Sequence, residues 1–100
     1  MQADAIYGVV HSASIASHKV MRQLRSRLLR SVGGSIRHLR HERGLTQEDL
    51  AGRAGLAVRH LQKIEAGEVN MTLYTVARLA SVLDVAPAAF FEKASTRRRP

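Results

Sequence analysis

The sequence predicts an all-α protein that consists of one small domain, and three observations carry this prediction. The chain has 100 residues and no cysteine, and aromatic residues make up only 4% of it, so a core must be built from Leu, Ile, Val and Ala, which suit packed helices. Apolar residues recur at spacings of three and four along most of the chain. Thr and Gly stand where such segments would begin and end.

Residues 1–30 are expected to form an N-terminal arm. The first part is weakly patterned, but residues 18–31 have the spacing of a basic amphipathic helix, with apolar residues on one side and arginines on the others. The apolar residues are Met21, Leu24 and Leu28. Four roles remain open for this helix: a solvated surface, packing on a second subunit, contact with DNA phosphates, or an anionic membrane surface.

Two glycines predict that this first helix ends before the next one begins. Gly33 and Gly34 are adjacent, and glycine is costly inside a helix. The following helix is therefore expected to start at Val32 or Ser35 and to end near Arg43, next to the stop signal Gly44.

The next two predicted helices are separated by a short turn. Thr46 is a helix cap, and Asp49 stands three residues later, close to a capping box. The small residue Ala51 allows two helices to cross closely, and Gly55 tolerates the positive φ of a sharp turn. Together with a helix over residues 58–66, these features predict a helix-turn-helix, whose second helix can enter the DNA major groove.

The last predicted helix begins after the cap Thr72 and has apolar residues at helical spacing. Pro87 suits the first position of a short final turn over residues 87–92. We therefore expect a folded domain over residues 31–94, followed by a basic tail over residues 95–100.

Charge and composition limit the function. The net charge is +8, and eight Lys or Arg but a single acid lie from Lys19 to Arg43, which favours a polyanion as partner. No cysteine is present, so a thiolate metal site is excluded and a reducing, cytoplasmic location is expected. The five His lack suitably spaced partners, and no catalytic triad is indicated, so we expect no metal, no cofactor and no enzyme. No apolar run reaches the roughly 20 residues of a membrane span.

Residues 32–92 resemble the lambda-repressor-like, Cro-type (XRE) DNA-binding domain. The matching stretches are "VGGSIRHLRHERGLTQEDLAGRAGL", "LQKIEAGEVN" and "TLYTVARLASVLDVAPAAFF". The resemblance implies a five-helix bundle, here with an N-terminal helical extension, that binds a DNA operator and is usually a dimer. The sequence departs from the family pattern at Ala57, where a Ser or Thr cap is usual, and at Met71, where Pro is frequent.

The resemblance also assigns roles to residues. Gln47 matches a phosphate contact at a helix N-terminus, where free N–H groups favour an anion. Arg59 matches a base reader and can donate two hydrogen bonds to guanine. Arg40 and Glu65 match an internal salt bridge. The other base-contact candidates are Val58, Lys63 and Gln62, and the other phosphate candidates are His60 and Asn70.

These expectations combine into one prediction of function. The chain is expected to be a sequence-specific transcriptional regulator that binds a palindromic operator as a homodimer, with the helix over residues 58–66 in the major groove. The alternative is an antitoxin-like or adaptor protein that mainly binds a protein partner such as a toxin, with DNA binding for autoregulation.

Overall fold

The protein is all-α over the residues that the computed structural model describes, 17–92, which confirms the predicted fold class. Residues 1–16 and 93–100, which hold the start of the predicted arm and the basic tail, lie outside this range. The described part contains four α-helices and one 3-10 helix and no strand. The elements are α2 (His18–Glu42), α3 (Gln47–Ala54), α4 (Val58–Glu65), α5 (Leu73–Leu83) and η1 (Pro87–Phe91).

The first helix corrects one prediction. Gly33 and Gly34 do not separate two helices, because α2 continues through both for 25 residues. A Cβ atom on Gly33 would overlap Ile64 O and lie 2.9 Å from Glu65 O, at the end of α4. Gly33 therefore permits two helices to approach closely, and the packing offsets the roughly 1 kcal/mol that glycine costs inside a helix.

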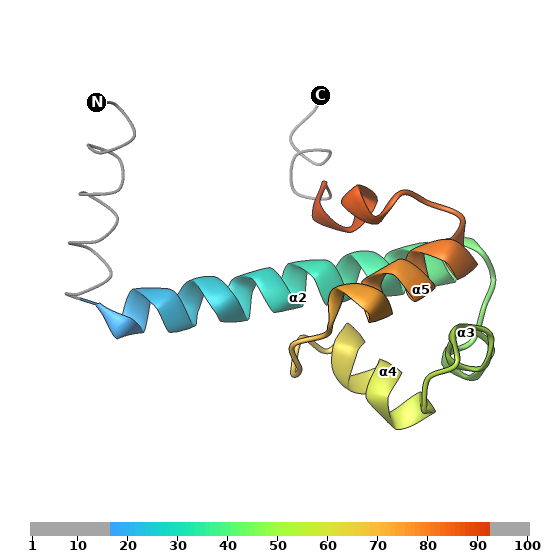
Figure 1. Ribbon diagram of the computed structural model, residues 1–100, viewed down its shortest axis with the longest axis horizontal. Helices are drawn as coiled ribbons and strands as arrows, with labels where there is room; N and C mark the ends of the chain where they lie inside the picture. The colour runs from blue at the N-terminus through green and yellow to red at the C-terminus, as the bar shows by residue number, and fades with distance from the viewer. Residues whose placement is uncertain (1–16, 93–100) are drawn as a thin grey trace.

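The hydrophobic core lies between the second half of α2 and the remaining elements. In Figure 1, α2 runs along the length of the molecule, with α3 and α4 below it and η1 above. Helix α2 packs on α4, α5 and η1, and α3 packs on α4 and α5. Seven large side chains in this core are fully buried: Ile36, Leu50, Leu61, Ile64, Leu79, Leu83 and Phe90.

Local signals in the sequence define most helix ends. Thr46 and Asp49 form the predicted capping box, with each side chain bonded to the backbone N–H of the other at 2.9 Å. Thr72 caps α5 through the backbone N–H of Thr75. Helix α5 ends at Asp84, which adopts the left-handed conformation with φ 58°, a role that more often falls to glycine.

The first half of α2, residues 18–31, extends past the other helices, and Figure 1 shows it projecting to the left. Ser17 caps it by accepting a hydrogen bond from the backbone N–H of Val20. Its large apolar side chains are about half exposed: Val20, Met21, Leu24 and Leu28. Among the described helices, including this long one, none has the length and apolar character needed to cross a membrane.

Candidate nucleic-acid interface

Helices α3 and α4 form a helix-turn-helix with a tightly fixed turn. Gly55 has φ 71°, and the backbone N–H of Leu56 donates to Ala51 O at 2.8 Å. Ala51 is completely buried, as expected for a small residue where two helices cross. The turn therefore holds α4 at one orientation on α3.

Helix α4 has one buried side and one exposed side. Leu61 and Ile64 attach it to the core, while three of the predicted DNA-binding residues share the exposed side: Arg59, Gln62 and Lys63. Val58 and His60 lie at the two edges of this side and are half-buried. Val58 also packs against the core, so less of its side chain is available to a base.

The N-terminus of α4 differs from that of α3. Ala57 provides no side-chain hydrogen bond to the first turn of α4, which follows from the absence of a hydroxyl group. The loss of such a cap costs about 1 kcal/mol. The orientation of α4 therefore depends on its packing and on polar contacts at its other end.

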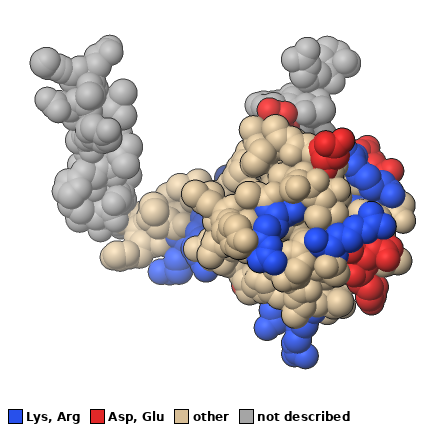
Figure 2. All heavy atoms as spheres, turned by 45° about the vertical axis from the view of Figure 1, so that its right-hand side comes forward, with Lys and Arg blue, Asp and Glu red and all other residues tan. Residues whose placement is uncertain are grey.

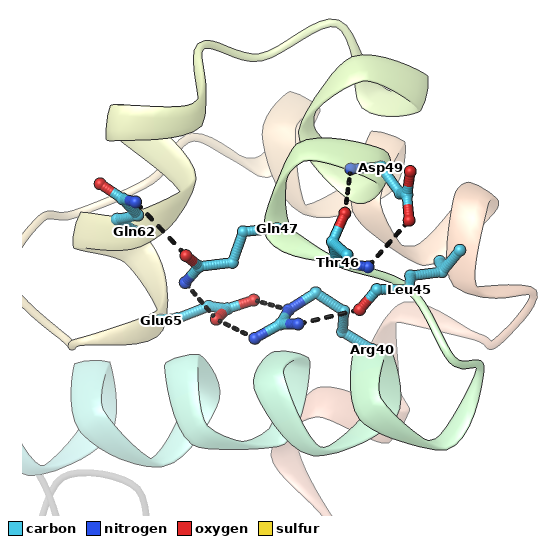
Figure 3. A network of polar contacts seen from close by, with 7 residues as sticks. All are labelled: Arg40, Leu45, Thr46, Gln47, Asp49, Gln62 and Glu65. Atoms are coloured by element: carbon cyan, nitrogen blue, oxygen red, sulfur yellow. Dashed lines mark hydrogen bonds and ion pairs between the residues drawn. The ribbon is translucent and has the colours of Figure 1, made fainter.

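A buried salt bridge joins the end of α4 to α2 (Figure 3). Arg40 Nε and Nη2 donate to the two carboxylate oxygens of Glu65, at 2.8 and 3.0 Å. Arg40 Nη1 also donates to Leu45 O at 2.9 Å, in the turn before α3. These are the two residues that the resemblance assigns to an internal salt bridge. The paired geometry is the strong, charge-assisted form of such a contact.

Gln47 extends this network to the first turn of α3. Its Nε2 donates to Glu65 Oε1 at 3.0 Å, and its Oε1 accepts from Gln62 Nε2 at 3.4 Å. The Gln47 side chain thus lies between a buried residue and an exposed residue of α4 (Figure 3). The sequence indicated neither contact, because both depend on the packing of α3 against α4.

The first turn of α3 contains two acidic side chains, Glu48 and Asp49, besides its backbone N–H groups. Its backbone N–H groups have no partner four residues earlier within the helix, and the helix dipole adds positive potential there. Two hydrogen bonds within the same turn lower the pKa of Asp49. The bond from the Thr46 backbone N–H has the larger effect, and the bond with the Thr46 side chain has the smaller one.

A polar hollow of about 390 Å³ opens between α2, α3 and α4. It is lined by Arg37, Arg40, Gln47, Gln62, Glu65 and Ala66. Arg37 is exposed and was not among the predicted site residues, although it stands one turn before Arg40 on α2. The remaining phosphate candidate, Asn70, is exposed in the loop after α4.

The described residues contain no cluster of three or more His, Cys, Asp or Glu that could hold a metal ion. Figure 2 shows Lys and Arg on several parts of the surface, including the lowest part of the domain, at the height of α4 in Figure 1. The candidate interface contains the cationic side chains of Arg59 and Lys63 and the amides of Gln47 and Gln62.

Comparison with known proteins gives consistent results. The family model of the helix-turn-helix domain matches residues 31–90. The chain is 41% identical over 54 residues to the HTH-type transcriptional regulator y4dJ of Sinorhizobium fredii, covering 54% of this chain and 70% of that protein.

Solved structures show the same fold. The restriction-modification controller protein C.AhdI from Aeromonas hydrophila is 36% identical, with a TM-score of 0.62 over 63% of this chain and 96% of its own. C.Esp1396I, a controller protein whose structure shows a tetramer with its natural 35 base-pair operator, is 33% identical, with a TM-score of 0.62 over 69% of this chain and 91% of its own. The chain therefore belongs to the helix-turn-helix domain family and has the Cro-type fold of DNA-binding transcriptional regulators.

Proposed function

We propose that the protein regulates transcription by inserting α4 into the major groove of a specific DNA operator. The observation that carries this proposal is the exposed side of α4, where Arg59, Gln62 and Lys63 lie together on a helix held by the buried Arg40–Glu65 bridge. A rigid helix that presents amide and cationic side chains matches the donors and acceptors on base edges.

The residues have separate roles in this proposal. Arg59 and Lys63 read bases, and Val58 adds apolar contact from the edge of the helix. Gln62 reaches the groove while its amide is oriented by Gln47. The phosphate contacts come from the first turn of α3 at Gln47, together with His60 and Asn70. Phosphate contacts set the position on DNA, and base contacts set the sequence preference.

The operator-bound form is proposed to be a homodimer. Two copies related by twofold symmetry would place their α4 helices about 34 Å apart, one turn of DNA, on a palindromic site. The tetramer of C.Esp1396I with its operator supports assembly on DNA for this fold. We assign no catalytic role to any side chain.

The test is selection of bound duplexes from a random DNA library at two salt concentrations. An inverted-repeat consensus that persists at higher salt is expected. Arg59→Ala should then weaken binding by about 1–3 kcal/mol and relax the preference at one base position. Arg25→Ala removes a cation from the projecting half of α2 and is the matched control. A wild-type chain that selects no consensus would contradict sequence-specific binding.

A second candidate function is supported by the apolar side of α2. Val20, Met21, Leu24 and Leu28 are about half exposed, which fits an antitoxin-like or adaptor protein that binds a protein partner such as a toxin. Leu24→Gln with Leu28→Gln, which adds no charge to α2, should abolish co-purification of that partner and leave operator affinity unchanged. A partner that remains bound to this variant would contradict the assignment.

A further inference from the structure

One side of α2 carries cations that the functions above do not use. Lys19, Ser26, Arg30 and Arg37 are spaced by seven, four and seven residues, so all four lie on the same side of a helix with 3.6 residues per turn. Arg30 Nη1 donates to Ser26 Oγ at 3.0 Å, as this arrangement requires. We name Lys19, Arg30 and Arg37 the basic stripe.

The basic stripe starts at the proposed DNA interface. Arg37 lines the same hollow as Gln47 and Gln62. Further along, Arg30 lies against the loop that follows α4, where a Cβ atom on Gly67 would come within 2.7 Å of Arg30 Cα. The stripe therefore faces the side of the molecule on which α4 lies.

The remaining surface of the projecting half carries both arginines and apolar residues, and Arg22, Arg25 and Arg27 lie about a sixth to a third of a turn from the basic stripe. Met21, Leu24 and Leu28 lie roughly half a turn away from the basic stripe around the helix axis, at about 100° per residue. No acidic residue occurs from residue 17 to residue 41, so no acidic side chain on α2 before Glu42 offsets the cations. A basic surface that continues from the interface is suited to the polyanion bound there, whereas a partner protein has a separate apolar surface to bind.

We propose that the projecting half of α2 binds phosphates of the DNA that flanks each operator half-site, through Lys19 and Arg30 in continuation of Arg37. This proposal rests on the operator binding proposed above. The 18 residue steps from Lys19 to Arg37 span roughly 27 Å at a rise of 1.5 Å per step. That length corresponds to about eight base pairs at 3.4 Å each, so the helix enlarges the footprint without reading bases.

The salt dependence of binding measures this contact directly. Each phosphate that a protein neutralises contributes about 0.9 to the slope of log K against log salt concentration. Lys19→Gln with Arg30→Gln should therefore lower the slope by about 1.8 for each bound half-site. The consensus sequence selected by α4 should stay the same, because neither residue reaches a base.

The experiment compares the wild type, the double variant and Arg25→Gln on two duplexes, one with about ten flanking base pairs beside the operator and one trimmed to the operator. Arg25 is the matched cation, since it lies about a third of a turn from the stripe. The wild type should bind the longer duplex more tightly, with a steeper slope, and the double variant should bind both alike. Arg25→Gln should behave as the wild type.

Three results would overturn the proposal: an unchanged slope in the double variant, an equal loss in Arg25→Gln, or no preference of the wild type for flanking DNA. Each of these leaves sequence-specific binding by α4 intact if the consensus is still selected. Because Arg30 also packs on Gly67, Lys19→Gln alone is measured in parallel, with an expected slope change of about 0.9.

Discussion

The two halves of α2 are one continuous helix in two different environments. In the half from residue 32 to 42, Ile36 and Arg40 are buried against the core and Glu65, whereas in the half from residue 18 to 31 Leu24 and Leu28 are about half exposed. Backbone hydrogen bonds continue through both halves. An isolated helix of 12–15 residues is marginal in water, so the projecting half depends on the buried half for its helical structure.

Removing the charge that pairs with Arg40 in the buried half should have the largest effect on stability. Glu65→Ala leaves the Arg40 guanidinium buried without its carboxylate and should cost about 3–5 kcal/mol of unfolding free energy, measured by urea denaturation. The control is Glu48→Ala in the exposed first turn of α3, with an expected cost of about 0.3–1 kcal/mol. Similar losses in the two variants would show that the buried salt bridge contributes little to the free energy of unfolding.

Matched truncations on the two halves should give different losses. Ile36→Ala removes a fully buried side chain and should cost about 2–5 kcal/mol. Leu24→Ala in the projecting half should change the unfolding free energy by less than about 0.5 kcal/mol. Thermal unfolding monitored by circular dichroism measures both. A comparable loss in Leu24→Ala would mean that the projecting half is packed in solution.

The close approach of α2 to α4 can be tested at Gly33. Gly33→Ala places a methyl group against the backbone of Ile64 and Glu65 and should cost about 1–3 kcal/mol. Gly52→Ala, in α3 with no atom near the added carbon, should instead stabilise by about 1 kcal/mol, since alanine favours the helix. Opposite signs in chemical denaturation are expected. Stabilisation by both substitutions would contradict the packing role of Gly33.

The smallest expected effect lies at the start of α2. Ser17→Ala removes the cap on Val20 N–H, worth about 1 kcal/mol, but only from the projecting half. Amide hydrogen exchange at residues 20–24 should therefore become about fivefold faster, while the global unfolding free energy stays unchanged. A fall in global stability equal to the local effect would show that the two halves unfold together.

The sequence predicted the features of the fold that have local causes. Thr46, Gly55 and Thr72 act at helix ends through their own side chain or backbone, so neighbouring residues suffice to recognise them. Gly33 was assigned wrongly because its role depends on the backbone of α4, about thirty residues away. Asp84 was missed because a left-handed helix end more often has glycine.

In the candidate site, as in the fold, the sequence predicted the features of single helices but not the contacts between helices. The exposed positions of α4 follow from helical spacing, and Arg40 and Glu65 were named from resemblance to a family. The contacts of Gln47 with Glu65 and Gln62, and the position of Arg37 at the hollow, require the angle between helices. The spacing of residues along one helix gives no information about the angle at which it crosses another helix.

The absence of a break in α2 gives the projecting half a fixed helical phase relative to α4. Deleting one residue between Met21 and Arg30 would rotate everything before it by about 100° and turn Lys19 away from the side on which α4 lies. Deleting seven residues would shorten the helix by about 10 Å and keep nearly the same phase. The DNA affinity should therefore vary periodically with the number of residues inserted into or deleted from this helix. Changes of two helical turns should reduce it least.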